Sequence, residues 1–442
     1  MEKLKSLPPE ALYKVCDTDI LPFRTTETLE NFNGFFGQER AIEAMGFGVG
    51  MRRPGYNLFV MGNPHTGRFS FAMESLKGIA KKEKKPRDWC YLNNLLDDRY
   101  PVAVELQAGK ATQLRRDNKR MIESIMTELP AVFENPAYQR KKSKIERDFN
   151  RYYDQAIDNV EKRAREQSIA VYQDAGTVGF TPVADGQAMD EAAFSQLPEE
   201  ARDTFSKNIS ELEDYLTESL TGLPQWRREA AERMKVLDRE TARQTVSPLI
   251  QAVKEKYNNI NFLPDYFNQL ESHIVKNCAE LINDEKLIEA RTENGRRTLL
   301  DEQFGVNLLV DNSKTKGSPV IFEAHPSYEN LFGRVEYNND MGALVTNFQM
   351  IRPGALHNAN GGYLVMEAEK LLEQPFVYGA LKRALKAHEI RIENPMSEFS
   401  GISTITLSPA PVPLHLKVAV IGGRDTYYLL QEMDQDFEKM FR

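Results

Sequence analysis

One short stretch, Asn57 to Phe71 (NLFVMGNPHTGRFSF), restricts the possible folds more than any other part of the chain. Its apolar run, Leu58 to Met61, has the length of a buried strand and breaks at Gly62. Gly67 follows, and the residues after it favour a helix up to about Lys82. A strand, a glycine-bounded loop and a helix in this order are the parts of a phosphate-binding loop. The stretch therefore predicts an α/β fold with a parallel sheet.

The same loop departs from the phosphate-binding pattern G-x-x-x-x-G-K-[ST] at its last two positions. Gly62 and Gly67 keep the geometry that turns backbone N–H groups toward anionic oxygens. Arg68 keeps the charge of the usual lysine, but its larger planar head does not occupy the position of an ammonium group. Phe69 removes the hydroxyl that would hold Mg²⁺, unless Ser70 supplies one from the next position.

A second stretch, Gly361 to Ala368 (GGYLVMEA), has the features of the strand that faces such a loop. A glycine pair precedes an apolar strand that ends in an acid, Glu367, which is in position to replace the magnesium-binding acid. Ala368 stands where hydrolysing proteins of this type carry a second acid that polarises water. Several independent departures in one site predict that ATP is not hydrolysed.

The chain of 442 residues is too long for one ordinary core, and its composition divides it into four parts. Residues 1–36 form a lead-in rich in Pro and Thr, which we expect to lie on the surface of the next domain. Residues 37–110 and 291–442 alternate strand-like and helical runs, and we assign them to the two parts of one α/β core. Residues 111–290 are charged and helical in pattern. The sequence thus predicts an α/β core interrupted by a long helical insertion.

The strand-like runs of the core are short and apolar. Besides the two strands already described, they are 89–92, 101–106, 306–310, 320–323, 342–345, 402–407 and 416–421.

The insertion contains two polar helices with narrow apolar seams, from about Lys141 to Ser168 and from about Pro198 to Leu220. Their apolar residues recur in steps of three and four, which is typical of a coiled-coil pair. Between them, residues 169–190 combine turn signals with β-prone residues and predict a β-ribbon at the tip of a protruding arm. A helical bundle domain with a β-flap is the alternative.

Charge, cysteine use and hydropathy argue against several classes of protein. The net charge of −8 disfavours nucleic acid as the main partner, and the basic runs at 81–87 and 140–147 fit solvated helix faces. The three cysteines lie far apart without a C-x-x-C pair, which fits a reducing compartment. No run of about 18 apolar residues occurs, so we expect a cytoplasmic protein without a membrane partner. No histidine pair has metal-ligand spacing with an acid, so no metal site is predicted apart from Mg²⁺ with nucleotide.

Several stretches together resemble the Lon-related AAA+ proteases, and the resemblance covers essentially the whole chain. They are GQERAIEAM, NLFVMGNPHTGRFSF, DWCYLNNLLDD, YENLFGRVEY and RPGALHNANGGYLVMEAEKLL. The closest group has an AAA-like domain with a long helical insertion, so the resemblance implies a P-loop NTPase (AAA+)-like core. By position it also implies a degenerate nucleotide site, formed by Gly62, Thr66, Gly67, Arg68, Ser70 and Glu367.

In that family a fused peptidase domain carries a Ser–Lys dyad, and homo-oligomeric rings of AAA-like domains, hexamers in the full proteins, feed it unfolded polypeptide. No serine of this chain lies in a setting like the family's P-x-D-G-P-S-A motif. We therefore expect an N-terminal part of a longer protein, without lid or peptidase domain and without catalytic residues of its own. The implied cofactor, ATP with Mg²⁺, is expected to bind weakly or not at all.

Three functions follow from these observations. The first is an AAA-like substrate-handling and assembly module of a Lon-related ATP-dependent-type serine protease, with a degenerate nucleotide site and no ATP hydrolysis. The second is an active ATPase unfoldase domain in which Ser70 and Glu367 replace the missing groups. The third is a nucleic-acid-binding P-loop protein that uses the basic runs.

Four residues are candidates for contact with the polypeptide substrate. Phe332, Phe348 and Met350 lie in an aromatic and aliphatic group beside glycines, as do the residues that grip polypeptide in the pore of the family's rings. Packing in the core is an equally good explanation for all three. Phe180 lies in the expected ribbon, which has no large surface to pack on and would expose it.

Overall fold

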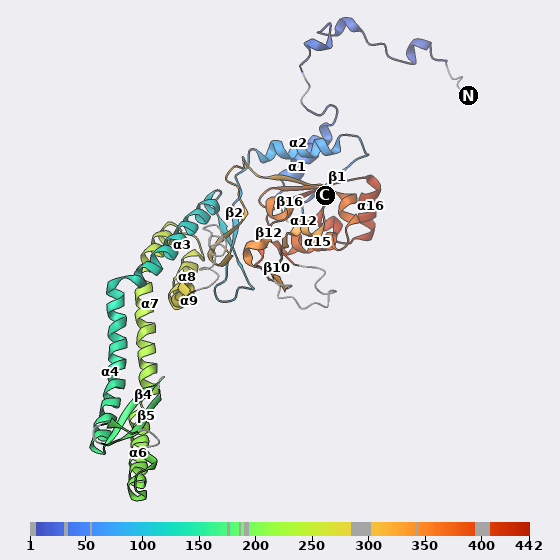
Figure 1. The fold of residues 1–442 in the computed structure, drawn as a ribbon. Helices are drawn as coiled ribbons and strands as arrows, with labels where there is room; N and C mark the ends of the chain where they lie inside the picture. The colour runs from blue at the N-terminus through green and yellow to red at the C-terminus, as the bar shows by residue number, and fades with distance from the viewer. Residues whose placement is uncertain are drawn as a thin grey trace.

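The computed structural model describes residues 6–30, 34–53, 55–174, 177–184, 187–189, 194–283, 302–340, 343–393 and 407–442. It contains an α/β body, a long helical arm and an N-terminal segment that leaves the body (Figure 1). The strand expected at 402–407 lies, except for its last residue, outside the described residues, as do the turns at 175–176 and 185–186.

The body is built on a four-stranded parallel sheet. In spatial order its strands are β1 (Leu58–Met61), β16 (Lys417–Gly422), β13 (Tyr363–Glu367) and β8 (Val320–Glu323). Strands that are covered on both faces have continuous apolar runs in place of alternation, and β13 and β16 are buried along almost their whole length. On the outer side of β1, Asn57 forms an isolated parallel bridge with Phe441. The parallel α/β sheet expected from the sequence is confirmed.

Helices cover both faces of this sheet (Figure 1). One face carries α1 (Glu39–Gly50) and α2 (Arg68–Ala80), whose Met45 and Leu76 belong to one apolar core with Val365. The larger core on the other face includes residues of α12 (Tyr328–Phe332), α13 (Ala355–Asn358), α14 (Ala368–Glu373), α15 (Val377–Ala387), α16 (Arg424–Met433) and α17 (Phe437–Met440).

A second sheet of three antiparallel strands joins the body to the helices of the arm (Figure 1). Its strands are β3 (Val102–Leu106), β2 (Asp88–Leu92) and β7 (Val306–Val310). Alternate residues of β2 face two different cores: Trp89 and Tyr91 belong to the body, whereas Cys90 and Leu92 belong to a helical core. That helical core is completed by α3 (Lys110–Glu134), α7 (Leu223–Lys256), α8 (Leu263–Lys276) and α9 (Cys278–Asn283). β2 and β3, which we assigned to the α/β core, thus form a wall between the body and the insertion.

A buried carboxylate, Asp88, fixes the start of α3 on this second sheet. Its Oδ2 accepts hydrogen bonds from the backbone N–H groups of Gly109 (2.6 Å) and Ala111 (3.2 Å), and its Oδ1 accepts one from Asn312 (2.8 Å). Gly109 precedes α3 in the left-handed conformation and has no side chain to cap the helix. Asp88 therefore supplies the missing cap from another strand and places a negative charge at the helix N-terminus, where it is favourable.

The arm consists of α4 (Pro136–Glu166) packed against α6 (Glu199–Ser219) and the outer half of α7 (Figure 1). The ribbon near its far end is formed by β4 (Ile169–Asp174), β5 (Thr177–Ala184) and β6 (Gln187–Ala188). These elements agree with the predicted helices and ribbon to within a few residues. We expected the helix over 198–220, now α6, to be the partner of α4. In the middle of α4, however, Tyr152 stacks on Trp226 of α7, with 5.6 Å between the ring centroids. A regular coiled coil stays a prediction.

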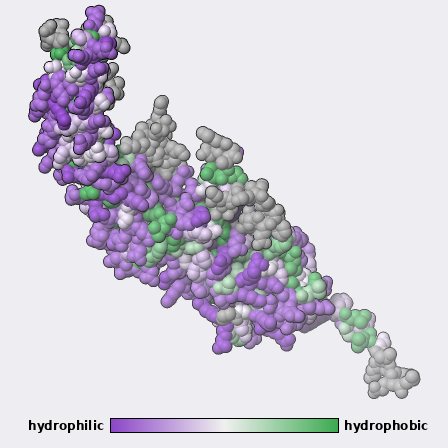
Figure 2. Space-filling view, turned by 90° about the horizontal axis from the view of Figure 1, so that it is seen from below, coloured by the Kyte–Doolittle hydropathy of each residue, from purple (hydrophilic) through white to green (hydrophobic). Residues whose placement is uncertain are grey.

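The N-terminal segment, residues 6–30, forms three short 3₁₀ turns, η1 (Pro9–Ala11), η2 (Thr18–Ile20) and η3 (Thr26–Thr28). None of these turns contains a buried residue. We expected the lead-in to lie on the surface of the next domain, but residues 6–30 extend away from it as a narrow tail (Figures 1 and 2). Nearer to the body, Phe35 packs edge-on against Phe71 of α2, with 4.9 Å between the ring centroids.

Candidate functional site

The loop between β1 and α2 contains Gly62 and Gly67, the two glycines of the predicted phosphate-binding loop. Gly67 has φ 79°, and His65 has φ 65°, so the chain turns through the left-handed region twice before α2 begins at Arg68. A Cβ added to Gly62 would lie 3.3 Å from the Thr66 Oγ1, which is closer than most such contacts. The Thr66 hydroxyl itself donates to the carbonyl of Asn63 (2.8 Å), within the loop. The loop is thus stabilised by its own residues.

The side chains that follow the loop point to other partners than a nucleotide. The Arg68 guanidinium folds back and donates to the carbonyl oxygen of Gly62 in its own loop. The ring of Phe69 packs edge-on against Phe322 of β8, with 4.7 Å between the centroids. Ser70, the next residue of α2, is exposed.

The three residues at the end of β13, Glu367, Ala368 and Glu369, have different surroundings. The side chain of Glu367 is exposed, whereas Ala368 is buried, and a Cβ added at Gly422 of β16 would lie 2.9 Å from its methyl group. Glu369 points to the start of α16, where its Oε1 accepts hydrogen bonds from the Gly423 N–H and the Thr426 hydroxyl, each 3.0 Å long.

Glu369 was not predicted from the sequence, although it is the acid that the structure brings toward the loop. Partial burial acts to raise the pKa of its carboxyl group, but the bonds from Gly423 and Thr426 and the nearby Arg68 charge bring this pKa below its usual value. The signal that could have found it is its place in the first turn of the helix after β13. An acid there can reach the neighbouring strand end and the helix that follows it.

The structure therefore gathers most of the predicted nucleotide residues at the carboxyl edge of the parallel sheet, which is the usual binding edge of such sheets. The loop has its two glycines, but the side chains of the site do not fit ATP with Mg²⁺. Arg68 is already engaged by a carbonyl, the position of the metal hydroxyl holds a phenyl ring, and Ala368 has no acid. Among the described residues, no group of three His, Cys, Asp or Glu side chains could hold a metal ion.

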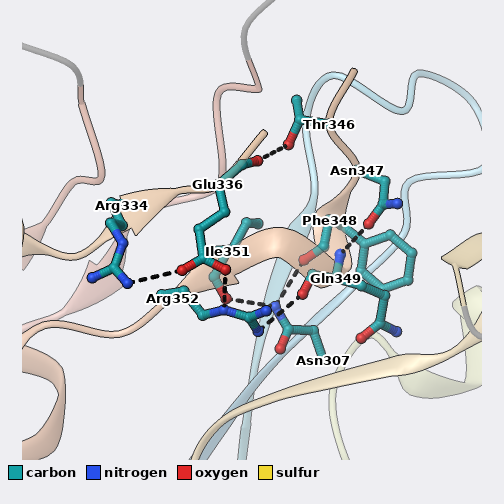
Figure 3. Close-up of polar contacts among 9 residues, drawn as sticks. All are labelled: Asn307, Arg334, Glu336, Thr346, Asn347, Phe348, Gln349, Ile351 and Arg352. Atoms are coloured by element: carbon teal, nitrogen blue, oxygen red, sulfur yellow. Dashed lines mark hydrogen bonds and ion pairs between the residues drawn. The ribbon is translucent and has the colours of Figure 1, made fainter. Parts of the chain in front are cut away.

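A second region projects from the body between α12 and α13 (Figures 1 and 3). It contains β9 (Arg334–Val335), the hairpin of β10 (Asn338–Asp340) and β11 (Ala343–Val345), η4 (Phe348–Met350) and β12 (Ile351–Arg352). β9 and β12 pair with each other at its base, and β10 pairs with β11 farther out.

Polar contacts fasten the base of this hairpin (Figure 3). Glu336 accepts hydrogen bonds from Arg352 (2.7 Å) and Arg334 (2.8 Å), and these bonds hold the pKa of its carboxyl group below the usual value. The buried Asn307 of β7 donates to the carbonyl groups of Phe348 (2.7 Å) and Ile351 (3.0 Å). The hairpin is thus tied to the same sheet that carries the arm.

The substrate-contact candidates have different environments in the structure. Phe332 is 3% exposed and Phe348 is 2% exposed, and both lie in the core of the body, so their burial favours core packing. Met350 is half-buried, as is Phe180, which packs beside Leu212 of the arm. The exposed apolar residues of this region are instead Leu344 and Val345 on β11, which the sequence did not single out. Their run of Gly, Ala, Leu and Val indicated a strand but not that the strand projects.

Comparison with known proteins gives two matches to family models. Residues 316–442 match the LonB-like AAA domain, and residues 88–121 match the Lon-like LonC helical domain. A protein of Escherichia coli (strain K12), named as a proposed Lon protease homolog, is 29% identical over 112 residues, which cover 25% of this chain and 17% of that protein. The first match contains β8, β13 and β16 of the central sheet, and the second contains β2, β3 and the start of α3. No described helix is long and apolar enough to cross a membrane.

Proposed function

Because this chain is a Lon-related protein with a LonB-like AAA domain, we propose that it is the AAA-like substrate-handling and assembly module of a Lon-related serine protease. In this proposal the module binds unfolded polypeptide and does not hydrolyse ATP. The observation that supports the absence of hydrolysis is that Arg68 donates its hydrogen bond to the Gly62 carbonyl within its own loop. Phosphoryl transfer depends on positioning and on neutralisation of charge, and both need groups that are free to face the phosphates.

The competing proposal, an active ATPase, requires Ser70 and Glu367 to replace the missing groups. Successive residues of a helix are turned by about 100° from each other, so Ser70 does not present its hydroxyl in the direction of position 69. Ring packing of Phe69 on Phe322 also fills the side of α2 that faces the sheet edge. Both observations favour a site without turnover.

Steady-state phosphate release with Mg-ATP tests this part of the proposal. We expect no release above a buffer blank, and release that disappears in an Arg68→Ala variant would overturn the proposal. Binding is measured separately by the shift in melting temperature. Nucleotide at 100 times its Kd would add about 2.7 kcal/mol to the free energy of unfolding, and we expect a much smaller change.

The polypeptide contact that we propose is the hairpin of β10 and β11. Two large apolar side chains, Leu344 and Val345, are exposed there, on a base held by Glu336 and Asn307. Exposed apolar side chains on a rigid projection are suited to transient contacts with unfolded chains, because they gain from burial without needing one sequence. The buried Phe332 and Phe348 would act only as support for this region.

Binding of a fluorescent, permanently unfolded protein, measured by anisotropy, tests the hairpin. The double variant Leu344→Ser and Val345→Ser should weaken binding about 10-fold or more, since each side chain contributes about 1 kcal/mol when partly buried. Val236→Ser is the matched control, because Val236 is an equally exposed apolar residue on α7 of the arm. Equal binding by both variants would overturn the assignment of the contact to the hairpin.

In this proposal the protein assembles into a homo-oligomeric ring and works in the cytoplasm. Nucleic acid remains the weaker alternative partner. Two residues of the basic run 81–87 already have partners within the protein: Lys85 donates a hydrogen bond to the Ser313 carbonyl (3.1 Å), and Arg87 forms an ion pair with Glu105 (2.9 Å).

A further inference from the structure

The N-terminal segment, residues 6–30, has the composition of an interface and the exposure of a free tail. Seven of its eight large apolar residues are between 39% and 74% exposed, namely Leu7, Leu12, Tyr13, Val15, Ile20, Leu21 and Leu29, and the eighth, Phe23, is half-buried. Segments that stay disordered in solution are poor in such residues, because apolar side chains bring a chain into contact with some surface. Figure 2 shows hydrophobic colour on this tail, beyond the mainly hydrophilic body.

Nothing among the described residues covers this segment. Its hydrogen bonds are those of its own turns, for example from Leu12 N–H to the Pro9 carbonyl (3.1 Å) and from Leu21 N–H to the Thr18 carbonyl (3.2 Å). Pro8, Pro9 and Pro22 restrict its backbone, so less conformational entropy is lost when it binds. The segment is therefore preorganised for a partner that is not among the described residues of its own chain.

The described body offers an apolar acceptor on the outer side of α16. Tyr428, Leu429 and Met433 are 58%, 55% and 76% exposed, and Leu429 and Met433 are one helical turn apart. The opposite side of the same helix is buried, with Leu430 packed in the core of the body. The helix is thus held rigidly while three large side chains face solvent.

We propose that the N-terminal segment of one copy binds the outer side of α16 of a second copy. The two surfaces lie on different parts of the same chain, so each copy both donates a segment and accepts one. Such head-to-tail contacts close into rings when the rotation between copies permits. A segment of ~25 residues also matches the roughly 20–30 residues per side of a standard protein interface. Extended, it spans up to ~80 Å, enough to reach the body of a neighbouring copy.

This inference deepens the assembly part of the proposed function, and Cys16 provides its test. Cys16 lies in the segment and is exposed, whereas Cys90 and Cys278 are buried, so a thiol-reactive, polarity-sensitive dye labels the segment alone. We expect its emission to move to shorter wavelength as the concentration of the full chain rises. Docking of the segment on its own body would instead give a shift that does not depend on concentration, and a free segment would give no shift. Either result would overturn the proposal.

Unlabelled full-length variants locate the acceptor. A chain with Leu12→Ser, Val15→Ser, Ile20→Ser and Cys16→Ser cannot donate its segment but still offers α16, so it should shift the dye of a dilute labelled chain. Adding Leu429→Ser and Met433→Ser to that chain should raise the concentration needed for half the shift about 100-fold, since each side chain contributes about tenfold. The matched control adds Phe47→Ser and Val236→Ser, at two exposed apolar residues outside α16, to the same chain and should leave the shift unchanged.

An unchanged shift with the α16 variant would overturn the proposed acceptor. The outcome is independent of the ATP and client-binding tests, because those are read at the loop after β1 and at the β10–β11 hairpin. A chain that binds unfolded polypeptide without a concentration-dependent dye shift would keep the proposed polypeptide handling and refute the docking of the segment.

Discussion

The substitution Asp88→Ala is expected to loosen the attachment of the arm to the body. It removes the acceptor of three backbone N–H groups, those of Gly109, Ala111 and Asn312, at a position that is fully buried. A hydrogen bond to a charged acceptor contributes about 1.5–3 kcal/mol, and the three are not additive because they share one carboxylate. Water can reach the start of α3 once the carboxylate is gone, so we expect a total loss of about 3–5 kcal/mol.

Hydrogen–deuterium exchange of the native protein measures this loss locally, without assuming that a chain with several cores unfolds in one step. A decrease of about 3 kcal/mol in opening free energy raises the exchange rate about 100-fold, because each 1.4 kcal/mol is a factor of ten. The increase should appear in peptides that cover the start of α3 and the end of β7, and not in α1 or α2. Asp88→Asn keeps one acceptor oxygen and should show about a 10-fold increase.

Asp311→Asn is the matched control, because Asp311 lies beside Asn312 in the loop after β7 but is exposed, and it accepts hydrogen bonds from the Ser313 N–H (2.8 Å) and the Thr112 hydroxyl (3.0 Å). Its effect should stay well below that of Asp88→Ala. If Asp88→Ala leaves the exchange of α3 and β7 unchanged, other contacts seat the arm and our account of this carboxylate is wrong.

Three further predictions concern other parts of the chain. Burial lowers the pKa of His357 to about 3, so the neutral imidazole contributes its full stability above about pH 6.5. This stability is lost as the pH falls toward 3, by up to about 1.4 kcal/mol per pH unit. The free energy of unfolding of His357→Leu, measured in urea between pH 7 and 4, should therefore fall less steeply with decreasing pH than that of the unchanged protein. Replacing Ile169 to Asp190 by a short Gly/Ser linker removes the buried Ile169 from the small core that it forms with Ala164 and Leu212, so hydrogen–deuterium exchange in α4 and α6 should become faster while the melting temperature of the α/β body stays nearly unchanged; a sharp fall in that melting temperature would contradict this. Cys16 should react with a thiol reagent in the native protein, but Cys90 and Cys278 only after unfolding, because burial raises the pKa of both thiols and excludes the reagent.

The sequence predicts the elements of the central sheet well, because each is a short apolar run bounded by glycine or a charged residue. β1, β8, β13 and β16 all lie within a residue or two of the expected runs. Pairing is harder to predict: β2 and β3 look like further strands of the same sheet, yet β2 lies between β3 and β7 in a separate sheet and pairs with both. Their burial on both sides comes from two different cores, which a pattern of apolar residues does not distinguish.

At the candidate site, the structure differs from the sequence predictions in the directions that side chains take. Gly62 and Gly67 predict the turn after β1 because glycine permits backbone conformations that other residues avoid, and Gly67 does lie in the left-handed region. That Arg68 turns back onto its own loop, and that Glu369 rather than Glu367 approaches it, depends on rotamers and on neighbours far away in sequence. Likewise, Phe348 and Leu344 are close in sequence, but only the first is covered by β7 and the body.

The central sheet also has a consequence for synthesis on the ribosome. β1 pairs directly with β16, so Leu58 waits for Ala419, about 360 residues later, which takes roughly 20–70 s at 5–20 residues per second. During that interval the apolar strand β1 and the inner sides of α1 and α2 have no sheet to cover. The nascent chain is therefore most exposed to aggregation early, and a chaperone that holds its first hundred residues would act there.

Folding of the residues between β1 and β16 also lowers the entropic cost of pairing these two strands. β2, β3, α3, α7, α8 and β7 contact one another, so they can complete a core of their own before β13 and β16 emerge. Once they do, Asn312 donates its side-chain amide to the Arg87 carbonyl (2.9 Å), and two distant points of the chain become neighbours. The loop that must close between β1 and β16 then shrinks from about 360 to about 135 flexible residues, which lowers its entropic cost by about 0.9 kcal/mol. Early folding of the residues between β1 and β16 therefore makes the pairing of these two strands about fivefold faster.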